Sequence, residues 1–101
     1  MRVDWHVAPS PASVGPATLS LHLRDAAGRP IERARLRLEG QMTHPGMAPV
    51  IVDVLEGAAG QYEAAFTFSM GGDWVLLLSG DLADGRHLRR EIEVPGVRAS
   101  R

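Results

Sequence analysis

Short runs of alternating hydrophobic and polar residues, separated by glycine, proline and aspartate, extend along most of this chain. The alternation is clear in residues 3–7, 19–24, 33–38 and 88–94, and residues 62–70 carry an apolar side chain at every second position. A period of two residues is typical of strands that bury one face. No segment sustains the 3.6-residue period of a helix, so the pattern predicts an all-β protein.

Two further strands are predicted at residues 50–55 and 74–78, where the apolar residues are nearly continuous. We expect the second of these to be a central strand covered on both sides. Seven short strands in a chain of this length are typical of an immunoglobulin-like antiparallel β-sandwich. We therefore expect a single domain over residues 1–101, with its core over about 3–95 and a frayed tail at 97–101. Its aromatic core residues should be Trp5, Phe66, Phe68 and Trp74.

Composition narrows the function classes further. The 11 basic and 12 acidic residues nearly cancel, so a nucleic-acid partner is not expected. The chain has no cysteine, which excludes disulfides, thiolate metal sites and thiol catalysis. No nucleophile and base show the spacing that a catalytic site requires, so we do not expect an enzyme.

No apolar run is long enough for a transmembrane helix, and no signal sequence precedes Val3. If the protein works outside the cytoplasm, we expect its export signal or anchor to lie outside the present sequence.

The segment with the most distinctive chemistry is residues 41–47, which holds Met42, His44 and Met47 around a Pro-Gly pair. Thioether and imidazole groups favour Cu(I) over hard ions such as Mg²⁺. A turn centred on Pro-Gly would bring the Cα atoms of His44 and Met47 to within about 7 Å of each other. Met42 precedes His44 by two residues and points to the same side in an extended chain. The alternative is a surface loop whose methionines cover the core.

Met70 is the fourth candidate ligand of this predicted Cu(I) site. It follows the inward-facing row of residues 62–68, and we expect it to reach Met47 because residues 50–56 and 61–67 should pair as a hairpin. Met70 could instead be a plug on the core, which would leave Met42, His44 and Met47 as a trigonal site. Trp74 could offer its ring to the cation, although a buried core position is the simpler interpretation.

The remaining histidines and the arginines are interpreted as surface residues. His6, His22 and His87 lie at outward positions of their strands, although any two of them could meet across strands. Arg33, Arg35 and Arg37 alternate with Ala34, Leu36 and Leu38, as expected of the solvated face of a half-buried strand.

Several motifs resemble the YtkA-like/FixH-like family of small β-sandwich domains. They are Asp25-x-x-Gly28-x-Pro30-Ile31, the Met/His loop, Gly60-Gln61-Tyr62-x-Ala64 and residues 68–74, and the resemblance extends over about 17–94. It implies a non-catalytic extracytoplasmic domain, periplasmic or membrane-anchored, with a possible link to copper supply. The transmembrane anchor of FixH-type proteins is absent from this sequence.

Together these observations predict an extracytoplasmic copper-binding domain that holds Cu(I) or transfers it, as a copper chaperone, to a copper-accepting or membrane-complex protein. The alternative is a metal-free interaction module of a membrane-associated complex, docking through an edge strand or the arginine face.

Overall fold

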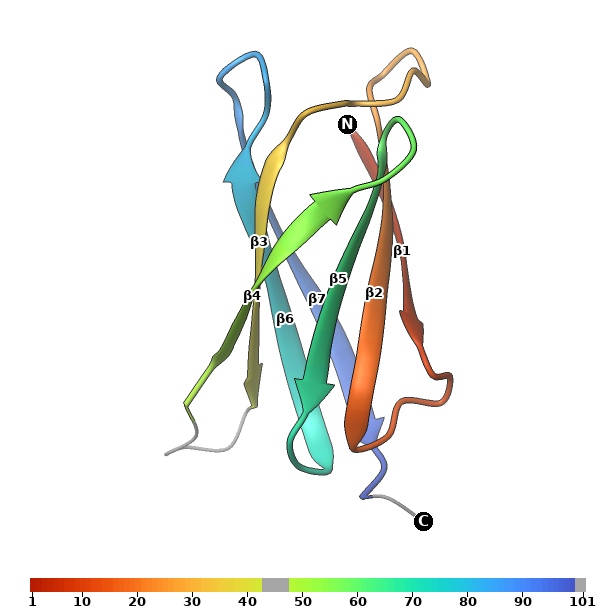
Figure 1. Cartoon of the computed structure of the whole chain (residues 1–101), viewed down its shortest axis with the longest axis vertical. Helices are drawn as coiled ribbons and strands as arrows, with labels where there is room; N and C mark the ends of the chain where they lie inside the picture. Colours follow the sequence, from red (N-terminus) through yellow and green to blue (C-terminus); the bar gives the residue numbers. More distant parts are fainter. Residues whose placement is uncertain (43–47, 100–101) are drawn as a thin grey trace.

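The computed structural model describes residues 1–42 and 48–99, and within them the chain forms seven β-strands (Figure 1). The strands are β1 (Arg2–Ala8), β2 (Gly15–Arg24), β3 (Arg35–Met42), β4 (Val50–Glu56), β5 (Gln61–Phe68), β6 (Gly72–Asp81) and β7 (His87–Val97). All neighbouring strands pair antiparallel. The all-β class and the number of strands predicted from alternation are confirmed.

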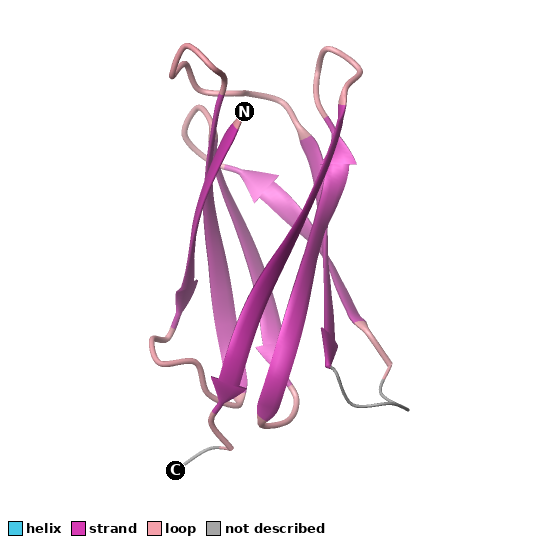
Figure 2. Ribbon diagram, turned by 180° about the vertical axis from the view of Figure 1, so that it is seen from behind, coloured by secondary structure: helices cyan, strands magenta, loops and turns pink. Residues whose placement is uncertain are grey.

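The strands follow the order β1-β2-β5-β4-β3-β6-β7 in one sheet that curls into two facing layers (Figures 1 and 2). The first layer holds β1, β2 and β5, and the second holds β4, β3, β6 and β7. The layers are connected through β4, which pairs with β3 along most of its length but with β5 only at its last two residues. Two antiparallel layers packed face to face are the architecture of the immunoglobulin-like sandwich.

A second connection between the layers lies just beyond β7. The backbone N–H of Val14 donates to the carbonyl of Arg98 at 2.8 Å, and the N–H of Arg98 donates to the carbonyl of Ala12 at 2.9 Å. Val97, the last residue of β7, is buried. The expectation that residues 97–101 fray does not hold for Val97, which is buried and paired with Gly72, or for Arg98, which is bonded to the segment between β1 and β2.

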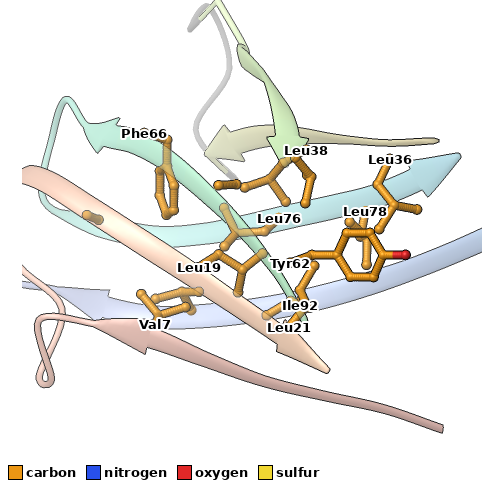
Figure 3. Packing of buried hydrophobic residues seen from close by; sticks show 14 of the residues in the cluster. Val7, Leu19, Leu21, Leu36, Leu38, Tyr62, Phe66, Leu76, Leu78 and Ile92 are labelled. Carbon is orange, nitrogen blue, oxygen red and sulfur yellow. The ribbon is translucent and has the colours of Figure 1, made fainter. Parts of the chain in front are cut away.

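The core lies between the layers and consists of the inward-facing residues of the strands (Figure 3). The ring of Phe68 packs edge-to-face against Phe66 and Trp74, with centroid separations of 4.9 and 5.3 Å. All three aromatic residues are buried, as predicted. The fully buried side chains around them include Leu19, Leu23, Leu38, Leu76, Leu78 and Leu88.

Trp5 does not join this core, so the prediction for this residue is wrong. It lies on the same face of β1 as the buried Val7 and pairs with the buried Leu21, yet 48% of Trp5 is exposed. The reason is that β1 is the edge strand of the first layer and has a neighbouring strand on one side only. Alternation identifies the face on which a side chain lies, whereas its depth depends on the strand's place in the sheet.

Two side chains hold the connection that crosses from β2 to β3. The Tyr62 hydroxyl donates to the carbonyl of Ile31 at 2.8 Å and accepts from the N–H of Ala34 at 3.1 Å. The Glu56 carboxylate accepts from the N–H of Arg33 at 2.9 Å. These bonds satisfy backbone groups that have no strand partner, so the crossing segment is fastened to β5 and to the end of β4.

Tyr62→Phe should lower the free energy of unfolding by about 1–2 kcal/mol. Tyr62 is only 1% exposed, and its burial raises the pKa of the phenol, which keeps the hydroxyl a neutral donor. Without it, the carbonyl of Ile31 and the N–H of Ala34 lose their partner. Urea unfolding measures the loss, and Thr67→Val removes an exposed hydroxyl from the same strand as a control expected to change stability by less than about 0.5 kcal/mol. Equal effects of both variants would contradict the role assigned to Tyr62.

The apolar run of residues 74–78 is covered on one side only. Its inward members are buried, namely Trp74, Leu76 and Leu78. Val75 and Leu77 point outward from β6 and stay partly exposed, so the prediction of a strand covered on both sides is wrong. This exposed apolar surface lies in the middle of the second layer.

The arginine row is shorter than predicted. Arg35 and Arg37 lie on β3 and face outward. Arg33 precedes the strand and has a positive φ of 60°, so it belongs to the crossing segment.

Candidate metal-binding site

Met42 ends β3 and lies beside the start of β6. Its backbone is paired opposite Trp74, and its Cε methyl lies 3.0 Å from the position that a Cβ on Gly72 would occupy. Gly72 has a φ of +126°, a conformation that residues with side chains rarely adopt. The missing side chain therefore leaves room for the half-buried thioether of Met42.

Met70 lies in the turn of residues 69–71 between β5 and β6. Its backbone carbonyl accepts a hydrogen bond of 2.9 Å from Nε1 of the buried Trp74. A Cβ on Gly71 would come within 2.9 Å of the Cβ of Ala99, so the turn also packs closely against the chain after β7. Met70 is 43% exposed, so it is not the core plug of the alternative interpretation. Its backbone carbonyl is held while the residue stays partly exposed to solvent.

The end of β3 at Met42 and the turn of residues 69–71 lie at the same end of the sandwich, which we call the methionine end (lower end of Figure 1). His44 and Met47 follow Met42 in the sequence but lie outside the described residues, so their part in the site stays a prediction. Of the four predicted ligands, the structure places Met42 and Met70 at one end of the fold.

The route by which Met70 reaches the methionine end differs from the predicted one. A long hairpin of β4 and β5 was expected to bring Met70 beside the Met/His loop. Instead β5 pairs with β4 only at Leu55–Glu63 and Glu56–Tyr62, and β4 turns away into the second layer. The strand that links Met70 to Met42 is β6. It follows the turn that contains Met70, and the whole of β3 pairs with it.

The other histidines lie away from the methionine end. His6 and His22 are on the outer face of the first layer, along a shallow hollow of about 340 Å³. His22 is half-buried, and its Nδ1 lies 3.0 Å from a guanidinium nitrogen of Arg24, while the exposed His87 pairs with Asp81 on the second layer. Within residues 1–42 and 48–99, no group of three or more histidine, cysteine, aspartate or glutamate side chains is placed to hold a metal ion.

The strand order and the core define a small immunoglobulin-like sandwich, and the methionine end is its most distinctive chemical feature. A family model described as YtkA-like matches residues 2–78, and the chain belongs to this family. No curated protein matches significantly. The fold is similar to part of MtrC from Shewanella baltica OS185, with a TM-score of 0.51 and 12% identity. That match covers 99% of this chain but only 22% of MtrC.

The part of the chain that the structure describes contains no helix that could cross a membrane.

Sequence reasoning missed two features near the methionine end. Gly72, which makes room for Met42, could have been noticed as half of a Gly-Gly pair after Met70. The outward Val75 and Leu77 could have been noticed because their positions in β6 alternate with the buried ones, while the neighbouring strands β3 and β7 place mostly charged residues outward.

Proposed function

We propose that this protein is an extracytoplasmic copper-binding domain that holds or transfers Cu(I) at the methionine end. The ligands would be Met42, His44, Met47 and Met70. The observation that carries the proposal is the position of Met42 over Gly72, two residues after Met70, so a thioether from β3 and one from the turn before β6 lie at the same end. The extracytoplasmic location rests on the family resemblance.

The chemistry of the donor set fits Cu(I). Thioether sulfur is a soft ligand that selects Cu(I), whereas Mg²⁺ and Ca²⁺ prefer several oxygen ligands. Met42 is fixed by strand pairing and Met70 by the bond between its carbonyl and Trp74. The ends of both ligand-bearing segments are therefore in place before metal binds, which lowers the ordering cost of binding.

Exposure favours transfer rather than permanent storage. Met70 is accessible to solvent, and an accessible ligand can be replaced by a ligand of an acceptor protein. Copper would then move by stepwise ligand exchange, without an intermediate in which the ion is free.

The test is a titration of the reduced protein with Cu(I) in competition with a chromogenic Cu(I) chelator. We expect the protein to withdraw one equivalent of copper. His44→Ala and Met47→Ala should each weaken binding at least tenfold, which is about 1.4 kcal/mol. The melting temperature of the metal-free protein should be nearly unchanged in both variants.

The controls separate ligands from structural residues. His6→Ala removes an exposed imidazole from the first layer and should leave copper affinity unchanged. Met42→Leu and Met70→Leu keep apolar volume while removing sulfur, so each should weaken copper binding without a large loss of stability. If the chelator keeps all the copper, or if the His44 and Met47 variants lose stability instead of affinity, the copper proposal is wrong.

A second candidate is a metal-free interaction module of a membrane-associated complex. The observation that favours it is the exposed apolar surface in the middle of the second layer. It predicts an activity that is independent of copper and that depends on Arg35 and Arg37.

A further inference from the structure

The outer face of the second layer carries charges of opposite sign in two adjacent rows. We call these the basic row and the acidic row. Across β3, β6 and β7, strand register aligns Arg37, Ser79 and Arg89 in the basic row. The next outward row toward the methionine end aligns Glu39, Leu77 and Glu91. The sign of charge therefore reverses between the rows on both β3 and β7.

Apolar side chains occupy the middle and one side of this face. Leu77 lies between the two carboxylates of the acidic row, and Val75 follows it on β6. Ile51 of β4 extends the acidic row beyond Glu39 and is 54% exposed, while the exposed Asp53 of β4 extends the basic row beyond Arg37. An exposed apolar patch with a charged rim is typical of a protein-binding surface.

The arginines and glutamates of the two rows form no ion pair with other described residues, although Glu39 accepts a hydrogen bond from the side-chain amide of Gln41. The ion pairs among the described residues lie elsewhere, at Arg2–Asp4, Arg29–Asp25, Arg86–Asp84 and His87–Asp81. None of them includes an arginine or glutamate of the basic and acidic rows.

We propose that this face binds a second copy of the chain, with the strands of the two copies antiparallel. A two-fold axis parallel to the face, perpendicular to the strands and between the two rows, places each basic row over the acidic row of the other copy. Arg37 then meets Glu39 of the second copy, Arg89 meets Glu91 of the second copy, and the reciprocal pairs form by symmetry. The two Leu77 side chains lie on either side of the axis. This proposal is independent of copper binding.

The size of the face indicates a weak dimer. Four strands at about 4.8 Å spacing and the 10 residues of β6 at about 3.4 Å each give a footprint of roughly 650 Å² per copy. Stable interfaces of standard size bury about 800 Å² per partner. We therefore expect a monomer–dimer equilibrium at roughly 10 µM to 1 mM protein.

Sedimentation velocity of the metal-free protein over that concentration range tests the proposal. The wild-type chain should show a sedimentation coefficient that rises with concentration toward the value of a dimer. Arg37→Glu/Arg89→Glu places like charges opposite each other in the proposed dimer, so its dissociation constant should increase at least tenfold. Arg2→Glu/Arg29→Glu makes the same change in net charge away from this face and should retain most of the association.

The decisive variant exchanges the two rows. Arg37→Glu/Glu39→Arg/Arg89→Glu/Glu91→Arg has the composition and net charge of the wild type. In the proposed geometry it restores every opposite pair, so it should dimerise with itself about as well as the wild type. In a mixture it should not combine with the wild type, because like charges then face each other. Thermal melting of each variant checks that the fold is intact.

A wild-type chain that stays monomeric up to about 1 mM would overturn the proposal. So would a dimer that the double reversal leaves unchanged, or a folded row-exchange variant that stays monomeric. A row-exchange variant that forms mixed dimers with the wild type would show that another surface is responsible.

Discussion

Gly80→Ala should lower the free energy of unfolding by about 3 kcal/mol or more. A Cβ on Gly80 would lie 1.9 Å from the carbonyl oxygen of Arg35, far inside van der Waals contact. The clash is with backbone, which cannot rotate away as a side chain can. Because Gly80 is paired with Leu36 on one side and Leu88 on the other, relief requires β6 to separate from a neighbouring strand.

Urea unfolding followed by circular dichroism measures this loss. The matched control is Gly57→Ala, since a Cβ on Gly57 meets nothing within 4 Å and its φ is not positive. The control should change stability by less than about 0.5 kcal/mol. If the free energy of unfolding of Gly80→Ala is within about 1 kcal/mol of the wild-type value, β3 and β6 do not approach each other as closely at Gly80 as the structure indicates.

The strands were predictable because burial of one face imposes a period of two on the sequence. In β5, each of Tyr62, Ala64, Phe66 and Phe68 is buried and each residue between them is exposed. The pattern cannot say which strand pairs with which, since alternation is the same for any neighbour. That is why β4 was expected beside β5 along its whole length but lies mainly beside β3.

The alternation pattern also could not predict how deeply a residue is buried. Trp5 and Val7 have the same parity, but only Val7 is buried, because β1 is an edge strand. Val75 and Leu77 were expected to be covered because apolar residues usually are, yet they face outward. Their exposure depends on what packs against the outer face of the second layer, and the sequence of β6 alone does not reveal this.

The candidate site was predictable in its residues and only partly in its geometry. Soft ligands clustered at residues 42–47 suggested copper, and Met70 was expected at the same end. The structure places Met42 and Met70 at one end, through pairing of β3 with β6 rather than through a β4–β5 hairpin. The support from Gly72 depends on contact between distant segments, which spacing along the chain does not reveal.

Trp74→Phe should both destabilise the fold and weaken Cu(I) binding, because Trp74 connects the core to the methionine end. Trp74 is 3% exposed, packs against Phe68 and donates from its indole nitrogen to the carbonyl of Met70. A phenylalanine ring would leave a cavity and would leave that carbonyl without its donor. We expect a loss of about 2–3 kcal/mol in the free energy of unfolding.

The effect on copper follows from the same hydrogen bond. Without the indole donor, the turn that carries Met70 is free to adopt other conformations. Ordering this turn when Cu(I) binds then makes the free energy of binding less favourable. Affinity for Cu(I) in the chelator competition should fall several-fold at a temperature where the variant is still folded. The matched control is Leu78→Ala, a core deletion farther along β6 that should cost about 2–5 kcal/mol but leaves the bond to Met70 in place. If both variants weaken copper binding equally, general destabilisation is the cause. If neither does, Met70 is not a ligand, and the proposed copper site reduces to the residues around His44.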